Sequence, residues 1–188
     1  MVVSEVDSRP VVRQGIGYYC QIGSDGRHIG GMLVTNSIGV PLEFKYTEPV
    51  TVSRLQKILY GMVLDRYLQE TLLRECLARE LSCDPEYFIT DFEGKEYLGT
   101  LAGREMIAIQ EVKSKPAGSP ASRTRTRESI VEIEDGPMLR VAFSTSDEAV
   151  RQAVIGWLKG IAKTMDVLEP IERVKTALRT ILADGRRR

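Results

Sequence analysis

Three short runs rich in strand-forming hydrophobic residues open the ordered part of the chain. They cover residues 17–22, 29–35 and 40–46, and four-residue turn sequences containing Gly and Ser follow the first two. Runs and turns of this length predict an antiparallel meander of three strands. Gly30 and Gly31 interrupt the second run, and we expect there either a β-bulge or the close approach of a ligand or another backbone.

After residue 49 the hydrophobic period changes from that of a strand to that of a helix. Ser53 and Gln56 form a capping-box pair, which predicts a helix start. Two apolar stripes follow that are out of phase with each other, with Gly61 where the phase is lost. We therefore expect a short helix ending near Tyr60 and a longer one from about Met62 to Leu81, or one helix bent at Gly61. The stripes consist of Leu55, Ile58, Leu59 and Met62, and of Leu64, Leu68, Leu72 and Cys76.

The rest of the chain predicts further strands and two strongly amphipathic helices. Residues 87–90 and 99–112 have strand character, and residues 129–134 and 138–143 flank a turn, as in a β-hairpin. Thr145 and Glu148 predict a second capping box, and Pro170 suits the first turn of a last helix. Because strands and helices do not alternate regularly, the predicted fold is α+β: an antiparallel meander, then helices, a second β-hairpin and two C-terminal amphipathic helices.

Composition divides the chain into three regions. Residues 113–128 are rich in Pro, Ser, Gly, Thr and Arg and poor in large hydrophobic residues, which predicts a disordered basic loop or linker. Residues 14–112 form the strand-helix-strand region before it, and residues 129–185 form the hairpin with two helices after it. We expect these two regions to pack as one domain, although the sequence leaves open whether the loop joins two domains or is an insertion in one.

A net charge of zero conceals a separation of charge along the chain. The chain has 26 basic and 26 acidic residues, and eight of the basic ones lie in the loop or at residues 186–188, which leaves about −8 on the remainder. The loop is therefore the predicted contact segment for a partner. Its candidate partner-binding residues are Lys113, Lys115, Arg123, Arg125 and Arg127.

The 188 residues, 43% hydrophobic and 28% charged, are typical of an ordinary globular protein. No hydrophobic run is long enough to span a membrane and the first residues do not resemble a signal peptide, so we expect a cytoplasmic protein with no membrane partner. Three cysteines without paired spacing predict neither disulfides nor a zinc site. His28 is the single histidine, which leaves little scope for a His-based catalytic relay.

Nucleotide-binding motifs are absent from the sequence, so no cofactor is expected and no catalytic or metal-binding residues are assigned. One enzyme hypothesis remains. A three-stranded meander, a helix and a strand occur in the same order at the start of the RNase H-like fold, which this chain resembles in that respect. The resemblance implies two Mg²⁺ ions held by carboxylates from separate elements, here Glu43 and Asp91. The family's leading Asp is absent, however, since residues 18–22 contain no carboxylate.

The functional prediction rests on the amount of apolar surface on the predicted helices. Two C-terminal helices and a long central helix present more apolar face than one small sheet needs, which is typical of a binding surface. We therefore expect a non-enzymatic protein-interaction subunit or adaptor, with a protein partner or a second copy of the chain. The alternatives are a nucleic-acid-binding protein that uses its basic flexible loop, or an RNase H-like metal-dependent nuclease.

Overall fold

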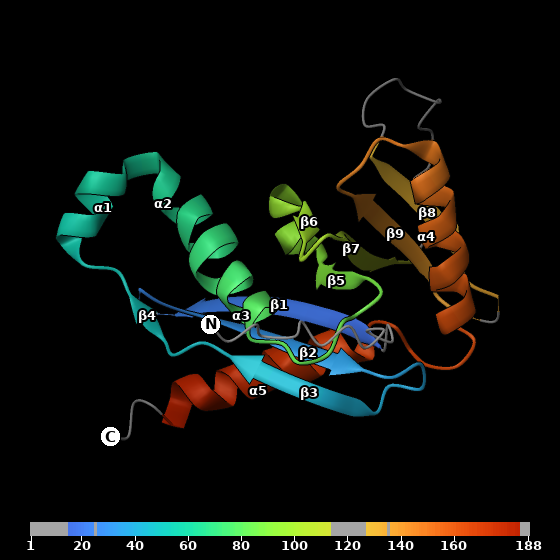
Figure 1. Ribbon diagram of the computed structural model, residues 1–188, viewed down its shortest axis with the longest axis horizontal. Coiled ribbons are helices and arrows are strands. Elements are labelled where there is room, and N and C mark those ends of the chain that lie inside the picture. Colours follow the sequence, from blue (N-terminus) through green and yellow to red (C-terminus); the bar gives the residue numbers. More distant parts are fainter. Residues whose placement is uncertain (1–14, 25, 114–126, 135, 185–188) are drawn as a thin grey trace, which may run out of the picture.

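The computed structural model describes residues 15–24, 26–113, 127–134 and 136–184. Nine strands form a mixed sheet with helices on both faces (Figure 1), so the α+β prediction is confirmed. The strands are β1 (Ile16–Ser24), β2 (Arg27–Thr35), β3 (Pro41–Tyr46), β4 (Val50–Thr51), β5 (Phe88–Asp91), β6 (Thr100–Leu101), β7 (Arg104–Val112), β8 (Glu128–Glu132) and β9 (Met138–Phe143). The helical segments are α1 (Arg54–Tyr60), η1 (Gly61–Val63), α2 (Leu64–Arg66), η2 (Tyr67–Glu75), α3 (Cys76–Arg79), η3 (Phe92–Tyr97), α4 (Glu148–Ile161) and α5 (Glu169–Asp184).

Strand order in the sheet is β3-β2-β1-β5-β7-β9-β8, with β4 beside β2 and β6 beside β7. The predicted antiparallel meander of β1, β2 and β3 is confirmed. β5 then pairs with β1 in parallel, and β7 pairs with β5 in parallel. The chain therefore leaves β1 toward one side of the sheet and later returns to its other side, so the sheet has a switch point between β1 and β5.

Gly30 and Gly31 allow helices to pack closely on both faces of β2. A Cβ atom on Gly31 would lie 2.8 Å from Leu178 of α5, and one on Gly30 would lie 3.1 Å from Leu73 of η2. The pairing of β1 with β2 is continuous through both glycines, and the irregularity lies between Val34 and Thr35, against β3. Neither a bulge nor a ligand explains the pair: the approaching atoms belong to two helices.

A π-helix divides the region between β4 and β5. The Ser53 capping box is present, with both of its hydrogen bonds, and α1 ends at Tyr60 before Gly61. η2 is π-helical over nine residues, and each π turn takes up more residues than an α turn. The buried face of this region consequently does not follow the predicted stripe through Leu72 and Cys76. Its buried leucines are Leu64, Leu68, Leu73 and Leu77, with a spacing of five in the middle.

The two C-terminal helices cover one face of the sheet, and η2 with α3 lies against the other (Figure 1). The predicted start of α4 is off by two residues, since Asp147 caps it by accepting hydrogen bonds from the backbone N–H groups of Ala149 and Val150. Across the described ranges, no helix combines the length and apolar content that crossing a bilayer requires. The apolar faces of α4 and α5 are buried in the protein's own core at Val154, Leu158, Ile171, Val174, Leu178 and Leu182.

The strands on either side of the basic loop lie in the same sheet, because β7 and β8 both pair with β9. Of the predicted contact residues, the structure describes Lys113 and Arg127, and both are exposed. Lys115, Arg123 and Arg125 lie outside the described residues.

Candidate functional site

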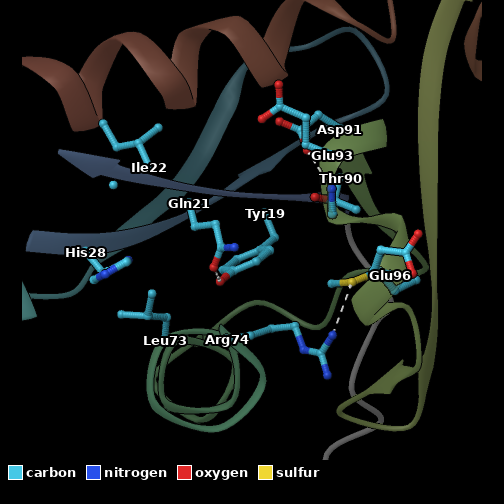
Figure 2. A pocket seen from close by; sticks show the side chains of 13 residues that line it. Tyr19, Gln21, Ile22, His28, Leu73, Arg74, Thr90, Asp91, Glu93 and Glu96 are labelled. Carbon is cyan, nitrogen blue, oxygen red and sulfur yellow. Dashed lines mark hydrogen bonds between the residues drawn. The ribbon is translucent and has the colours of Figure 1, made fainter. Parts of the chain in front are cut away.

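A hollow of about 510 Å³ opens where β5 ends beside β1 (Figure 2). β5 pairs with only three residues of β1, up to Tyr19, and β1 then continues to Ser24 without a strand on that side. Ligands in open sheets often bind at the carboxyl ends of parallel strands beside such a switch point. The polar residues that line the hollow are Tyr19, Gln21, His28, Arg74, Thr90, Asp91, Glu93 and Glu96.

The end of β5 is fixed by the side chain of Asp91. This residue is the N-cap of η3, and its Oδ1 accepts a hydrogen bond from the backbone N–H of Gly94 at 3.1 Å. Gly94 is needed at that point, since a Cβ there would lie 2.8 Å from Oγ1 of Thr90. The tight turn ends the strand and starts the segment that forms one wall of the hollow.

On the face of the sheet toward η2, polar side chains line the hollow together with the apolar side chains of Leu73 and Met106. The Tyr19 hydroxyl donates a hydrogen bond to Oε1 of Gln21 at 3.1 Å, and Figure 2 shows both side chains directed to the side where Arg74 lies. Burial raises the pKa of Tyr19, although the positive charge of Arg74 opposes this, so the phenol stays neutral at ordinary pH. Arg74 is 7% exposed, and its Nη1 lies 3.9 Å from Sδ of Met106. This wall therefore presents neutral hydrogen-bonding groups around a buried cation.

On the face toward α5, three charged groups lie together. Nζ of Lys175 lies 2.7 Å from Oδ2 of Asp91 and 3.7 Å from Oε1 of Glu172. Burial lowers the pKa of Lys175, but the hydrogen bond and charge of Asp91 outweigh it, so the pKa is raised overall and the amine is a cation. Cys20 of β1 is on the same face, and its thiol lies 3.7 Å from the carbonyl oxygen of Ile171. Burial, together with the nearby charge of Asp91, raises the pKa of this thiol, so it is neutral.

The two carboxylates suggested for a metal site do not meet. Asp91 faces α5, whereas Glu43 is on the opposite face and accepts hydrogen bonds from the backbone N–H groups of Ser82 and Cys83. Strands β1 and β2 also separate them. In the described part of the chain, no three His, Cys, Asp or Glu side chains are grouped so that they could hold a metal ion. These residues do not fit the two-Mg²⁺ arrangement that an RNase H-like nuclease requires.

A second hollow, of about 340 Å³, lies on the other side of η3 and reaches the end of the basic loop. Lys95, Glu96, Arg127 and Glu128 are among its lining residues, and Glu96 also lines the first hollow. Glu128 binds Arg140 at 2.6 Å and Lys95 at 3.6 Å. η3 therefore lines both hollows, and Lys95 and Arg127 lie beside the carboxylates Glu96 and Glu128 on the side where the loop ends.

Aromatic contacts fix the position of two of these cations. Nζ of Lys95 lies 4.5 Å from the centre of the Phe92 ring, and the guanidinium carbon of Arg140 lies 4.7 Å from it. Sequence reasoning identified Arg127 and Asp91 but missed Lys95, Arg140, Arg74 and Lys175. Arg74, Arg140 and Lys175 lie in ordinary helical or strand patterns and Lys95 lies in the turn segment after β5, and only the pairing of distant segments brings each of them to the site.

Comparison with known proteins is informative at the level of fold. No family model matches the chain, and no curated protein matches it. Among solved structures, the chain is similar to endonuclease V of Ciona intestinalis, solved with a 24mer DNA that contains an inosine followed by a ribo-adenosine. That likeness has a TM-score of 0.53 and 15% identity, and covers 91% of this chain and 86% of the other. At this identity the likeness establishes a shared fold.

Two further likenesses are weaker. Endonuclease V of Bacillus subtilis matches with a TM-score of 0.37 and 14% identity, over 70% of this chain and 65% of the other. Argonaute of Marinitoga piezophila, solved with a guide RNA, matches with a TM-score of 0.34 and 8% identity, over 77% of this chain and 25% of the other.

The prediction of a non-enzymatic protein-interaction subunit or adaptor is wrong. The shared fold is that of a nuclease, which contradicts an adaptor and favours the alternative that involves nucleic acid. Part of the physical reason is that the apolar faces of α4 and α5 are not surplus, and an exposed apolar face remains on α1, at Leu55, Ile58 and Leu59. Helices α4 and α5 bury their stripes against the protein's own sheet.

Proposed function

We propose that this protein binds nucleic acid along η3, with the sugar-phosphate backbone against the side of Lys95 and Arg127 and against the basic loop. The second hollow carries the proposal: Lys95 and Arg127 line it, and it adjoins the first hollow through Glu96. A fold shared over most of the chain with a nuclease that was solved on DNA supports the same conclusion.

Charge distribution favours phosphate contacts on the loop side of η3. Lys113 and Arg127 are exposed where the loop leaves and re-enters the sheet, and the loop itself adds Lys115, Arg123 and Arg125. The first hollow suits phosphate less well, because Asp91 and Glu93 line it in addition to Glu96, which the two hollows share, and these carboxylates repel an anion. We therefore assign the backbone contacts to the loop side.

This site is poorly suited to recognise a particular base sequence. Phe92 already lies against Lys95 and Arg140, so its ring faces are not available for stacking on bases. Binding is therefore expected to depend mainly on charge and to fall with salt. We also propose that the protein is located in the cytoplasm.

The test is fluorescence anisotropy with labelled single-stranded and duplex DNA and RNA, at salt concentrations from about 50 to 200 mM. One variant replaces all five predicted contact residues, Lys113, Lys115, Arg123, Arg125 and Arg127, by Ser at constant loop length. Each lost phosphate contact should reduce the slope of log affinity against log salt by roughly 0.7–0.9.

Lys159→Ala is the matched control, since Lys159 is an exposed lysine of α4 outside both hollows. It should leave affinity and slope unchanged. Failure of all four nucleic acids to bind at the lowest salt would overturn the proposal. If the five-residue variant binds with an unchanged slope, the basic loop does not contact nucleic acid, and that part of the proposal is wrong.

A further inference from the structure

The ammonium group of Lys175 lies between two carboxylates at the end of β5, where this fold brings elements from distant parts of the chain together. Asp91 comes from the sheet and Glu172 from α5, and they lie 2.7 Å and 3.7 Å from the nitrogen. Side chains of Lys175 and Asp91 are both 17% exposed, so solvent screens this pair much less than a surface pair.

The charge site around this cation is closed on the side of Asp91 and open to solvent on the side of Glu172, whose side chain is 66% exposed. Cys20, on the adjacent strand, contributes a neutral thiol that faces the carbonyl of Ile171 and not a carboxylate. Oδ1 of Asp91 is occupied by the backbone N–H of Gly94, so its remaining oxygen is the one that meets Lys175. Both carboxylates thus have a fixed cation available from within the chain.

We propose that Lys175 is a built-in cation that takes the position a divalent metal would occupy between these carboxylates. The protein consequently keeps this end of the sheet together without Mg²⁺ or Mn²⁺. Without the amine, Asp91 and the more exposed Glu172 are two carboxylates that have lost their shared cation, and a divalent cation becomes the favoured replacement. This inference does not depend on nucleic-acid binding and can be tested without any nucleic acid.

The experiment measures thermal unfolding of the full chain in EDTA and in about 1 mM MnCl₂. The Tm of the unmodified protein should be the same in both. For Lys175→Ala, Mn²⁺ should raise the Tm by roughly 3–6 °C, because a ligand that binds only the folded state stabilises it. The double variant Lys175→Ala with Asp91→Asn should lose that rise.

Lys163→Ala is the control, because it also removes one lysine from an ion pair, with Glu134 at 3.3 Å, but at an exposed place. It should show no response to Mn²⁺. A Lys175→Ala variant without a Mn²⁺ response would overturn the proposal.

A second experiment gives an answer even when Lys175→Ala does not fold. It adds Mn²⁺ to the unmodified protein and measures the signal of the free ion by electron paramagnetic resonance, which decreases when the ion binds. The free-ion signal should stay undiminished. A diminished signal that Asp91→Asn restores would show that the position takes a metal, and the proposal would fail.

Discussion

Helix α1 and the C-terminal helices α4 and α5 all have apolar stripes in their sequences, but their surroundings differ. α4 and α5 bury their apolar residues against the sheet, whereas α1 buries none of its residues, and Leu59 on it is 71% exposed. The pattern of hydrophobic positions therefore predicts that a helix forms and which side is apolar. It does not predict that something covers this side, because that depends on where the chain places the helix relative to the sheet.

Core packing should differ most between the two regions. Leu178 on α5 is fully buried and faces Gly31, so Leu178→Ala should lower the free energy of unfolding by about 2–5 kcal/mol. Leu59→Ala on α1 should change it by less than about 0.5 kcal/mol. Urea denaturation measures both, and equal losses would show that α1 is covered in solution.

The next largest effect is expected in the π-helix η2, which follows α1 in the less covered helical region. Leu73 is 1% exposed, whereas its neighbour Leu72, which the α-helical stripe selects, is only partly buried. Leu73→Ala should cost about 2–4 kcal/mol and Leu72→Ala clearly less. The reverse order in the same denaturation experiment would mean that this segment is α-helical.

Glu43 connects the end of the α1–α3 region to the sheet through Ser82 and Cys83, and this contact should depend on pH. Burial raises the pKa of Glu43, but the backbone N–H groups of these two residues and the charge of Lys45 outweigh it, so its pKa is lowered overall. Its stabilising effect is thus complete above the unfolded value of about 4.3 and is lost as the pH falls through the lower folded value.

Replacement of this carboxylate should therefore matter at neutral pH and not in acid. Glu43→Gln should cost about 1–2 kcal/mol at pH 7, with a difference from the unmodified protein that shrinks below about pH 4. Denaturation curves at a series of pH values measure it. A constant difference across the series would assign the loss to packing.

Helix capping gives the smallest of these effects, on the well-covered side. Asp147→Ala removes the acceptor for two N–H groups at the start of α4 and should lower stability by about 1 kcal/mol. Thr145→Ala should cost less, because Thr145 Oγ1 bonds the N–H of Asp147 and not the helix. A larger effect of Thr145→Ala would indicate that Thr145 caps the helix, as the sequence predicts.

Local sequence signals predicted most of the fold. Runs, turns and caps identified the meander, the hairpin, α1 and the last helix, because those elements depend on neighbouring residues. The π-helix was not predictable, since its extra residue per turn is selected by the packing of Leu73 and Leu77 on Gly30. Parallel pairing of β1 with β5 was also missed, because it joins residues about 70 positions apart.

The candidate site was less predictable than the fold. Asp91 was found through the resemblance in element order to the RNase H-like fold, but its partner Lys175 belongs to a helix more than 80 positions later. Lys95 and Arg140 meet at Phe92 only after η3 packs beside the hairpin. A sequence shows which residues could act, whereas the sheet decides which of them come together.

The pairing of β7 and β8 with opposite edges of β9 constrains the chain between them. Val112 is level with Met138, and Glu128 is level with Ala142 at the other end of β9, so the two strands run in the same direction with β9 between them. Their ends are therefore about 16 Å apart, which at least five extended residues must cross. The 15 residues from Lys113 to Arg127 reach this distance with chain to spare. Excision of the whole segment would break the crossover and unfold the sheet, whereas removal of its charges leaves the path intact.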